Sequence, residues 1–430
     1  MRIQCRAIAT PGVGLVAGGF ALSTEGSVIK SIRPESAEGP FRNCIAVPGL
    51  VQSHIHLCQT LFRGMAENRT LLPWLEERIW PLEAAHDPDS TRVSALLTLR
   101  ELLASGCTGL LDMGSVRHSS QTIDVLRKSG IRARAGNSLM DRGPDCLASE
   151  LAWLREETQR VRSACGDLVG YAWVPRFALS CSDKLWEWVA DESAEGVRAT
   201  HSSEAPEEME EPVIVSAGGN VRFLQSRGFL GRGTLLAHCV QLQPGEAELL
   251  ASTGTIAVHC PWTNLRLGSG VADVPMLSSA GVRVVLGSDG APCNNRLDLA
   301  GDLRLAMSLA SIRRRPSGLS GAFWLKAATE EAARSLGWRG VGRLERNWQA
   351  DLVLLEPTEE EWEMLETGED PIRDLLELHW PSRVRMTVVA GRTLYSDGRY
   401  STLPEPGSNL ADLRRSLIRR AGTSAGGAEV

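Results

Sequence analysis

The sequence predicts an α/β protein: a (β/α)₈ TIM barrel beside a small β-sandwich domain that both chain ends build. Eight apolar, strand-like segments follow one another between residues 44 and 287, separated by helix-like amphipathic stretches. Both ends of the chain read instead as short strands broken by Gly and Pro. Five of the eight histidines follow the ends of predicted barrel strands, where barrels of this kind carry their chemistry.

Composition limits the possible functions. The chain has 430 residues, 43% of them hydrophobic, which is enough to bury a large core. A net charge of -6 argues against a nucleic-acid partner, because such proteins need a basic surface. The sequence shows no signal-peptide pattern and no apolar stretch of about 18 residues. We therefore expect a cytoplasmic protein that does not bind membranes and whose ten scattered cysteines are reduced.

The elements can be assigned in chain order. Predicted strands of the N-terminal unit cover 3–8, 14–23 and 28–32. The barrel strands are predicted at 44–56, 109–113, 131–136, 169–179, 197–201, 234–238, 255–259 and 282–287. Helices are predicted at 90–105, 121–128, 146–163, 184–191, 244–252 and 323–336.

Capping signals and composition set the boundaries. Asp89 or Ser90 can cap the first helix, and Gly106 follows its end. Strands return at 350–355, 384–389 and 392–396, where we expect them to pair with the N-terminal unit. The predicted division is a small β domain of 1–47 and 345–420, a catalytic barrel of 48–344 and a flexible tail of 421–430.

Polar residues at the strand ends predict a metal site. His54 and His56 end the first barrel strand, and residues two apart point to one face of a strand. His201 ends the fifth strand and Asp289 follows the eighth. Three imidazoles and one carboxylate leave a coordination position for water, as a catalytic zinc site requires.

Two further residues at this face could transfer protons. Glu204 follows His201 by three residues, close enough to carry a proton from an attacking water to a leaving group. Its alternative role is a surface carboxylate, because an acidic run follows it. His238 could bind the metal or orient the water, and Asp289 could act as both ligand and base.

The positions of the four lysines in the sequence favour a site with a single metal ion. Lys30, Lys128, Lys184 and Lys326 all lie away from the ends of the predicted strands. A lysine bridging two metals is therefore unexpected. Zinc is favoured by the ligand types, and iron and manganese accept similar sets.

The strand-end motifs resemble those of the metal-dependent amidohydrolase superfamily, in its cytosine deaminase and triazine-hydrolase branch. They read His54-Ile55-His56-Leu57, His201-Ser202-Ser203-Glu204, Leu236-Ala237-His238-Cys239, His259-Cys260-Pro261-Trp262 and Leu286-Gly287-Ser288-Asp289-Gly290. The resemblance implies that His54, His56, His201 and Asp289 hold the metal while Glu204 and His238 handle protons. The implied reaction is attack of metal-bound hydroxide on an aromatic heterocycle, with release of ammonia.

The resemblance also indicates a substrate. Phe62-Arg63-Gly64, Trp80-Pro81-Leu82-Glu83 and the stretch from Asp289 to Asn295 are similar to deaminases of 5'-deoxyadenosine, methylthioadenosine and S-adenosylhomocysteine. This implies that Glu83 binds ribose hydroxyls and that His259 and Asn295 also contact the substrate. We therefore expect an aminopurine-like small molecule, most plainly an adenine nucleoside such as 5'-deoxyadenosine, and a homo-oligomeric enzyme.

Other functions stay open at this point. Gln59 and the segment beginning Pro175-Arg176-Phe177 resemble guanine deaminases, and Arg176 and Gln59 could read the amide edge of an oxo-purine. A triazine (chloro)hydrolase uses the same chemistry on another ring. A non-catalytic, metal-stabilised binding protein is an alternative of another class. Trp74 and Trp80 could cover the pocket, although core packing is the commoner role of tryptophan.

Overall fold

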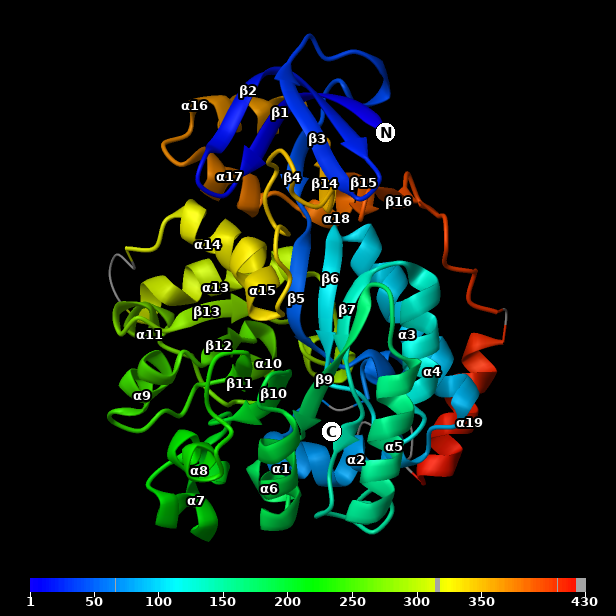
Figure 1. The fold of residues 1–430 in the computed structure, drawn as a ribbon, viewed down its shortest axis with the longest axis vertical. Coiled ribbons are helices and arrows are strands. Elements are labelled where there is room, and N and C mark those ends of the chain that lie inside the picture. Colours follow the sequence, from blue (N-terminus) through cyan, green and yellow to red (C-terminus); the bar gives the residue numbers. More distant parts are fainter. Residues whose placement is uncertain (66, 314–317, 408, 423–430) are drawn as a thin grey trace.

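A nearly closed ring of parallel strands forms the centre of the computed structural model, which describes residues 1–65, 67–313, 318–407 and 409–422. Its strands are β5 (Leu50–Ile55), β6 (Cys107–Asp112), β7 (Arg132–Ala135), β9 (Val169–Pro175), β10 (Val197–Ser202), β11 (Thr234–His238), β12 (Ile256–His259) and β13 (Arg283–Leu286). They pair in chain order, and a short strand β8 (Ser138–Leu139) adds to β9. The predicted (β/α)₈ barrel is confirmed (Figure 1).

Helices surround these strands (Figure 1). They include α3 (Pro88–Ala104), α4 (Ser119–Ser129), α5 (Leu151–Ala164), α6 (Asp183–Glu192), α9 (Glu246–Thr253), α11 (Val274–Ser279), α13 (Leu299–Arg313), α14 (Gly321–Ala328) and α15 (Glu330–Ser335). The helix expected at 323–336 is two helices, because Thr329 leaves the helical conformation between them. The predicted cap of α3 was wrong: Asp87 is the N-cap and accepts from Ser90 N–H, with Pro88 at the first helical position.

The first predicted strand serves two sheets. Residues 44–56 divide into β4 (Ile45–Pro48), which joins the small sheet, and β5, which begins the barrel. Gly49 lies between them, and a Cβ added there would come within 2.1 Å of the Thr108 side chain. The chain therefore passes from one sheet to the other at a residue that needs the absence of a side chain.

The two chain ends build one small sheet, at the end of the molecule opposite α1 (Leu71–Trp74) and α2 (Trp80–Ala84) (Figure 1). Its strands are β1 (Arg2–Thr10), β2 (Gly14–Glu25), β3 (Val28–Pro34), β4, β14 (Leu352–Leu355), β15 (Val384–Val389), β16 (Arg392–Ser396) and β17 (Arg399–Tyr400). The order β17-β16-β15-β14-β4-β1-β2-β3 places β4 and β14 at its centre. This confirms the predicted pairing of the two ends, while the division at residues 47, 345 and 420 stays a prediction.

Helices α16 (Glu359–Thr367), α17 (Pro371–Glu377) and α18 (Trp380–Arg383) connect β14 to β15. The last helix, α19 (Leu410–Ala421), packs against α2 (Trp80–Ala84) and α3 beside the barrel. Most of the predicted flexible tail lies outside the described residues. None of the helices within the described ranges has both the length and the apolar character that crossing a lipid bilayer requires. The ten cysteines, all of them described, are unpaired.

A buried ion pair joins the barrel to the small sheet, and we expect its loss to be costly. Arg132 Nε on β7 donates to Asp351 Oδ2 at 2.6 Å, and both side chains are almost fully buried. Arg132→Ala would leave the Asp351 carboxylate buried without its cation, and such truncations destabilise proteins by about 3–5 kcal/mol. Denaturant unfolding measures this loss. Arg415→Ala, which removes an exposed pair with Asp412, should leave the free energy of unfolding nearly unchanged.

Candidate metal centre and active site

Four side chains from three barrel strands meet at one point. His54 belongs to β5, His56 follows it, His201 belongs to β10, and Asp289 follows β13. Asp289 Oδ1 lies 3.4 Å from His54 Nε2 and 3.3 Å from His56 Nε2. His56 Nε2 and His201 Nε2 are 3.1 Å apart, and the four ligand atoms all lie within 4.8 Å of one another. This is the set of groups that the sequence predicts as metal ligands.

The donor atoms fit a divalent cation. Bonds of 2.0–2.2 Å in a tetrahedral arrangement separate ligand atoms by about 3.4 Å, close to the separations between these atoms. His54 Nε2 is buried and has no hydrogen-bond partner within the described residues, so a cation would satisfy it. Burial lowers the pKa of His56 to about 3 and that of His201 well below its usual range. Both rings are therefore neutral, which is the form of imidazole that binds metals.

Backbone contacts orient two of these ligands. His201 Nδ1 donates to the carbonyl of Arg176 at 2.6 Å, which leaves Nε2 free to face the cluster. Asp289 has a left-handed backbone with φ of 62°, its N–H donates to the His54 carbonyl at 3.1 Å, and its Oδ1 accepts from Gly290 N–H. A non-glycine residue in this region is strained, and such strain is concentrated at functional sites.

Glu204 and His238 lie beside the four ligands. His238 Nε2 is 3.3 Å from Glu204 Oε2, and His238 Nδ1 donates to Asn264 Oδ1 at 2.9 Å. Burial, with a contribution from the Asp289 and Glu208 charges, raises the pKa of Glu204 well above its usual range. The carboxyl group can therefore hold a proton near neutral pH and exchange it with a bound molecule. Asn264 lies two residues after the His259-Cys260-Pro261-Trp262 motif, and only the fold shows its contact with His238.

Three of the predicted substrate-binding residues form one buried group. Arg176 donates to Glu83 through Nη1 at 2.5 Å and through Nη2 at 3.2 Å, and Gln59 Nε2 donates to Glu83 Oε1 at 2.8 Å. Burial would raise the pKa of Glu83, but the Arg176 guanidinium outweighs it and holds that pKa below its usual range. Glu83 is therefore an ionised carboxylate close to the predicted metal ligands.

The other two predicted substrate-binding residues, His259 and Asn295, lie outside this buried group. His259 is buried at the end of β12 and is absent from the residues that line the cavity over the four ligands. Asn295 accepts from Gly64 N–H and donates to Glu67, so it joins two loops at the rim. Their predicted contacts with substrate stay predictions.

The cavity over the four ligands is nearly closed. Its volume is about 30 Å³, which suits small solvent molecules and not a purine. Leu71 and Trp74 of α1 (Leu71–Trp74), Leu75 of the π-helical turn η3 (Leu75–Ile79) and Phe177 form its apolar wall. The sequence allowed Trp74 as a lid or as core, and the structure places it over the site. Trp74 also packs with Trp80 in one apolar cluster beside the cavity, so Trp74 is both cavity wall and core.

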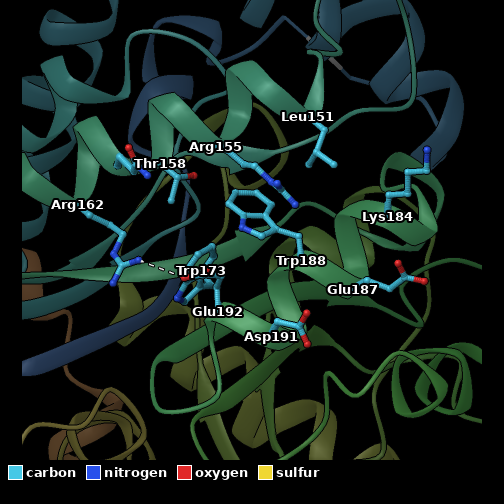
Figure 2. A pocket seen from close by; sticks show the side chains of 11 residues that line it. Leu151, Arg155, Thr158, Arg162, Trp173, Lys184, Glu187, Trp188, Asp191 and Glu192 are labelled. Carbon is cyan, nitrogen blue, oxygen red and sulfur yellow. Dashed lines mark ion pairs between the residues drawn. The ribbon is translucent and has the colours of Figure 1, made fainter.

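A larger groove of about 560 Å³ lies between α5 and α6 on the outside of the barrel (Figure 2). Figure 2 shows Trp173 and Trp188 among the side chains that line it, and the two rings are in contact. The Arg155 guanidinium lies 5.4 Å from the Trp188 ring centroid. Arg162 likewise lies 5.5 Å from the Trp173 ring centroid. These rings already contact arginines, and no residue of the four-ligand cluster lines the groove. The chemistry therefore belongs to the smaller cavity at the strand ends.

Comparison with known proteins places the chain in a family. The amidohydrolase family model matches residues 45–394. The chain belongs to the amidohydrolase family. It is 34% identical over 334 residues to a 5-methylthioadenosine/S-adenosylhomocysteine deaminase of Archaeoglobus fulgidus, covering 77% of this chain and 79% of the relative. It is 31% identical over 362 residues to a 5'-deoxyadenosine deaminase of Methanopyrus kandleri, covering 83% and 82%.

Solved structures of this amidohydrolase fold are similar over almost the whole chain. An adenosine deaminase from Xanthomonas campestris with bound zinc has a TM-score of 0.85 and 25% identity, covering 98% of both chains. A guanine deaminase from C. acetobutylicum has a TM-score of 0.83 at 22% identity, covering 92% of this chain and all of that one. At 22% identity, the similarity to the guanine deaminase shows only that the two proteins share a fold.

Proposed function

We propose that this amidohydrolase hydrolytically deaminates an adenine nucleoside such as 5'-deoxyadenosine, releasing ammonia. The observation that carries the proposal is the convergence of His54, His56, His201 and Asp289 beside the buried Glu204. Structural zinc sites are closed tetrahedra, mostly of Cys and His, whereas an ion held by three imidazoles and one carboxylate can expand to five-coordinate and take a water as its fifth ligand. The names of the relatives, deaminases of 5'-deoxyadenosine and related nucleosides, support the same reaction.

The arrangement assigns a role to each group. When bound, the cation supplies Lewis acidity that lowers the pKa of a water molecule and polarises the reacting carbon. Glu204 takes one proton from the attacking water and delivers it to the ring nitrogen as the C–O bond forms. It then transfers the second proton of that water to the amine, which leaves as ammonia when the C–N bond breaks. His238, held by Asn264, faces Glu204 and orients the oxygen that adds to the ring. The apolar wall of Leu71, Trp74 and Phe177 excludes bulk water.

Glu83 provides the proposed contact to the sugar. A carboxylate offers about four lone-pair sites, and Arg176 and Gln59 occupy three of them. The remaining capacity suits a ribose hydroxyl. Because a cavity of about 30 Å³ is smaller than a nucleoside, we propose that the segment of α1 and η3, which contributes Leu71, Trp74 and Leu75 to its wall, moves aside when substrate enters.

We propose zinc as the resident ion, because three imidazole nitrogens and one carboxylate oxygen suit it. Metal analysis of the purified protein distinguishes zinc from iron and manganese, which accept similar ligands. A cytoplasmic location and a homo-oligomeric state likewise stay predictions, and light scattering tests the second.

An ammonia-release assay over a small substrate panel tests the proposed function. The panel contains 5'-deoxyadenosine, methylthioadenosine, S-adenosylhomocysteine, adenosine, guanine and an aminotriazine. We expect the adenine nucleosides to give the highest kcat/KM. A metal-loaded protein that releases no ammonia from any of them would show that the site does no such chemistry and would favour a metal-stabilised binding protein.

Guanine or another oxo-purine is the second candidate, and one observation favours it. Gln59 Oε1 is buried without a hydrogen-bond partner within the described residues, and Arg176 lies beside it, lining the same cavity. An amide acceptor next to a guanidinium donor complements the edge of an oxo-purine. A substrate that leaves such a buried polar pair without hydrogen-bond partners can have a kcat/KM that is lower by roughly 10⁴–10⁵-fold.

Arg176→Ala separates the two substrates. If the enzyme deaminates guanine, this variant should lose guanine turnover while retaining any activity on 5'-deoxyadenosine. Guanine turnover is also measured in the double variant Arg176→Met with Glu83→Gln, because Arg176→Ala alone leaves Glu83 buried without its cation. Loss of both activities in Arg176→Ala, with a lowered melting temperature, would assign Arg176 a role in holding the fold of the pocket instead.

A further inference from the structure

We propose that the side chains of Gln52, Ser288, Asp302 and Asn294 form a positioning network that sets the spacing of the metal ligands. The network holds the last barrel strand, β13, against the first, β5. Its effect on catalysis rests on the proposed function, but its effect on metal binding does not. The residues themselves do not touch the predicted ion, so they are positioning residues.

The place where the barrel closes makes such a network necessary. The hydrogen-bonded strand order runs from β13 through to β5 without a ladder between these two end strands. Within the described residues, a single parallel bridge between Ile55 and Asp289 joins them. Yet three of the four predicted ligands, His54, His56 and Asp289, lie at the ends of these two strands. The geometry of the metal centre therefore depends on the least regular junction of the barrel.

Gln52 supplies the missing strand contacts. Its Oε1 accepts from the Ser288 N–H at 2.9 Å, and its Nε2 donates to Ser288 Oγ at 2.5 Å. A side-chain amide offers the same acceptor and donor as a peptide group. Gln52 thus replaces a backbone ladder at the position immediately before Asp289.

Asp302 and Asn294 complete the network from beyond β13. Ser288 Oγ donates to Asp302 Oδ2 at 2.5 Å, and Asn294 Nδ2 donates to the Ser288 carbonyl at 2.7 Å and to Asp302 Oδ1 at 3.1 Å. All four side chains of the network are buried. Asp302 lies in α13, so the network also fixes the helix that follows β13.

Burial of the Asp302 carboxyl group is energetically unfavourable. No ion pair to Asp302 is present within the described residues, and its bonded partners are the neutral Ser288 and Asn294. A buried carboxylate without a cation is destabilising unless hydrogen bonds compensate for its lost hydration. An apolar side chain would fill the same space without that cost. The presence of an aspartate at position 302 therefore fits a requirement to fix the Ser288 hydroxyl.

Small displacements at this junction would reach the ligands directly. The Asp289 N–H donates to the His54 carbonyl at 3.1 Å, and a Cβ added to Gly287 would lie 2.8 Å from that same oxygen. The two backbones are therefore in close contact. Asp289 keeps its left-handed φ of 62° only while the residue before it is fixed. Loss of the network would let Asp289 relax away from the paired imidazoles.

Metal affinity of the intact protein tests the network. The variants are Gln52→Leu, which removes both contacts to Ser288 at similar volume, and Asp302→Asn, which leaves one of its donors without an acceptor. Zinc affinity is measured by competition with a chromophoric chelator, and ligand geometry by the visible spectrum of the cobalt(II) protein. We expect each variant to lose about 10-fold or more in affinity, as for other outer-shell partners of metal ligands, and to change the cobalt spectrum.

Asp351→Asn is the matched control. It alters a buried carboxylate of the same size that pairs with Arg132 at the junction with the small sheet. We expect it to lower the melting temperature without changing zinc affinity or the cobalt spectrum. Ser288→Ala, which keeps the backbone contact to Gln52, provides a milder variant if either of the first two does not fold.

The outcomes separate the network from the proposed function. Wild-type affinity and an unchanged spectrum in the folded variants would overturn the proposed network. An equal loss in Asp351→Asn would overturn it too, because general loosening would then explain the result. A wild-type protein that binds zinc but deaminates nothing would contradict the proposed function and leave this test fully readable.

Discussion

Glu204→Gln is expected to lower the rate of ammonia release by roughly 10²–10⁴-fold, the usual contribution of a general acid–base group. Glutamine keeps the shape and the contact with His238, which lies 3.3 Å from the Glu204 carboxyl, but it cannot accept or deliver a proton. Steady-state kinetics measure the loss. Metal content should stay at the wild-type value, because Glu204 is not one of the four converging ligand groups.

Glu210→Gln is the control for this experiment. It changes an exposed carboxylate of the same acidic run and should leave both kcat and metal content unaltered. The sequence alone left open that Glu204 is a surface residue of that run. If Glu204→Gln is as active as the wild-type protein, Glu204 does not carry protons in the proposed reaction and is a carboxylate of the acidic run like its neighbours.

Asp289→Asn is expected to weaken metal binding by more than the 10–100-fold typical of outer-shell substitutions, so at least about 100-fold, with a matching loss of turnover. The amide lacks the negative charge that balances the cation, although its size is the same. In the wild-type protein, Asp289 Oδ1 lies within 3.4 Å of both His54 Nε2 and His56 Nε2. Dialysis against buffer followed by metal analysis measures the loss.

Asp273→Asn controls for the loss of a carboxylate near the end of the barrel. Asp273 caps α11 and accepts from Met276 N–H at 2.8 Å. Its substitution should cost at most about 1 kcal/mol in stability and nothing in metal content. Full retention of metal by Asp289→Asn would mean that the ion binds elsewhere or that the histidines alone hold it.

The barrel and the ligand set followed from local sequence patterns. Apolar strands ending in histidine or aspartate mark one face of a barrel, because parallel strands of a barrel end on the same side. That rule was enough to bring His54, His56, His201 and Asp289 together before any distance was known. The helix α3 shows the limit of such rules, since Asp87, Asp89 and Ser90 are all chemically able to cap and only the fold decides among them.

The contacts between distant segments were not predictable. The pairing of Arg176 with Glu83 joins residues 93 positions apart, and nothing local to either residue specifies it. The same holds for the apolar wall over the cavity, which depends on how α1 packs above the strand ends. Gln52 and Asp302 gave no signal at all, because a buried polar side chain reads in the sequence like any surface residue.

The central claim is that residues of the first, fifth and eighth strands hold one ion that makes this chain a nucleoside deaminase. Titrating metal-free protein with zinc while recording ammonia release from 5'-deoxyadenosine tests it most directly. We predict that activity rises in proportion to added zinc and levels off at one ion per chain. Activity that is indifferent to zinc, or that stays absent at one bound ion per chain, would contradict the claim.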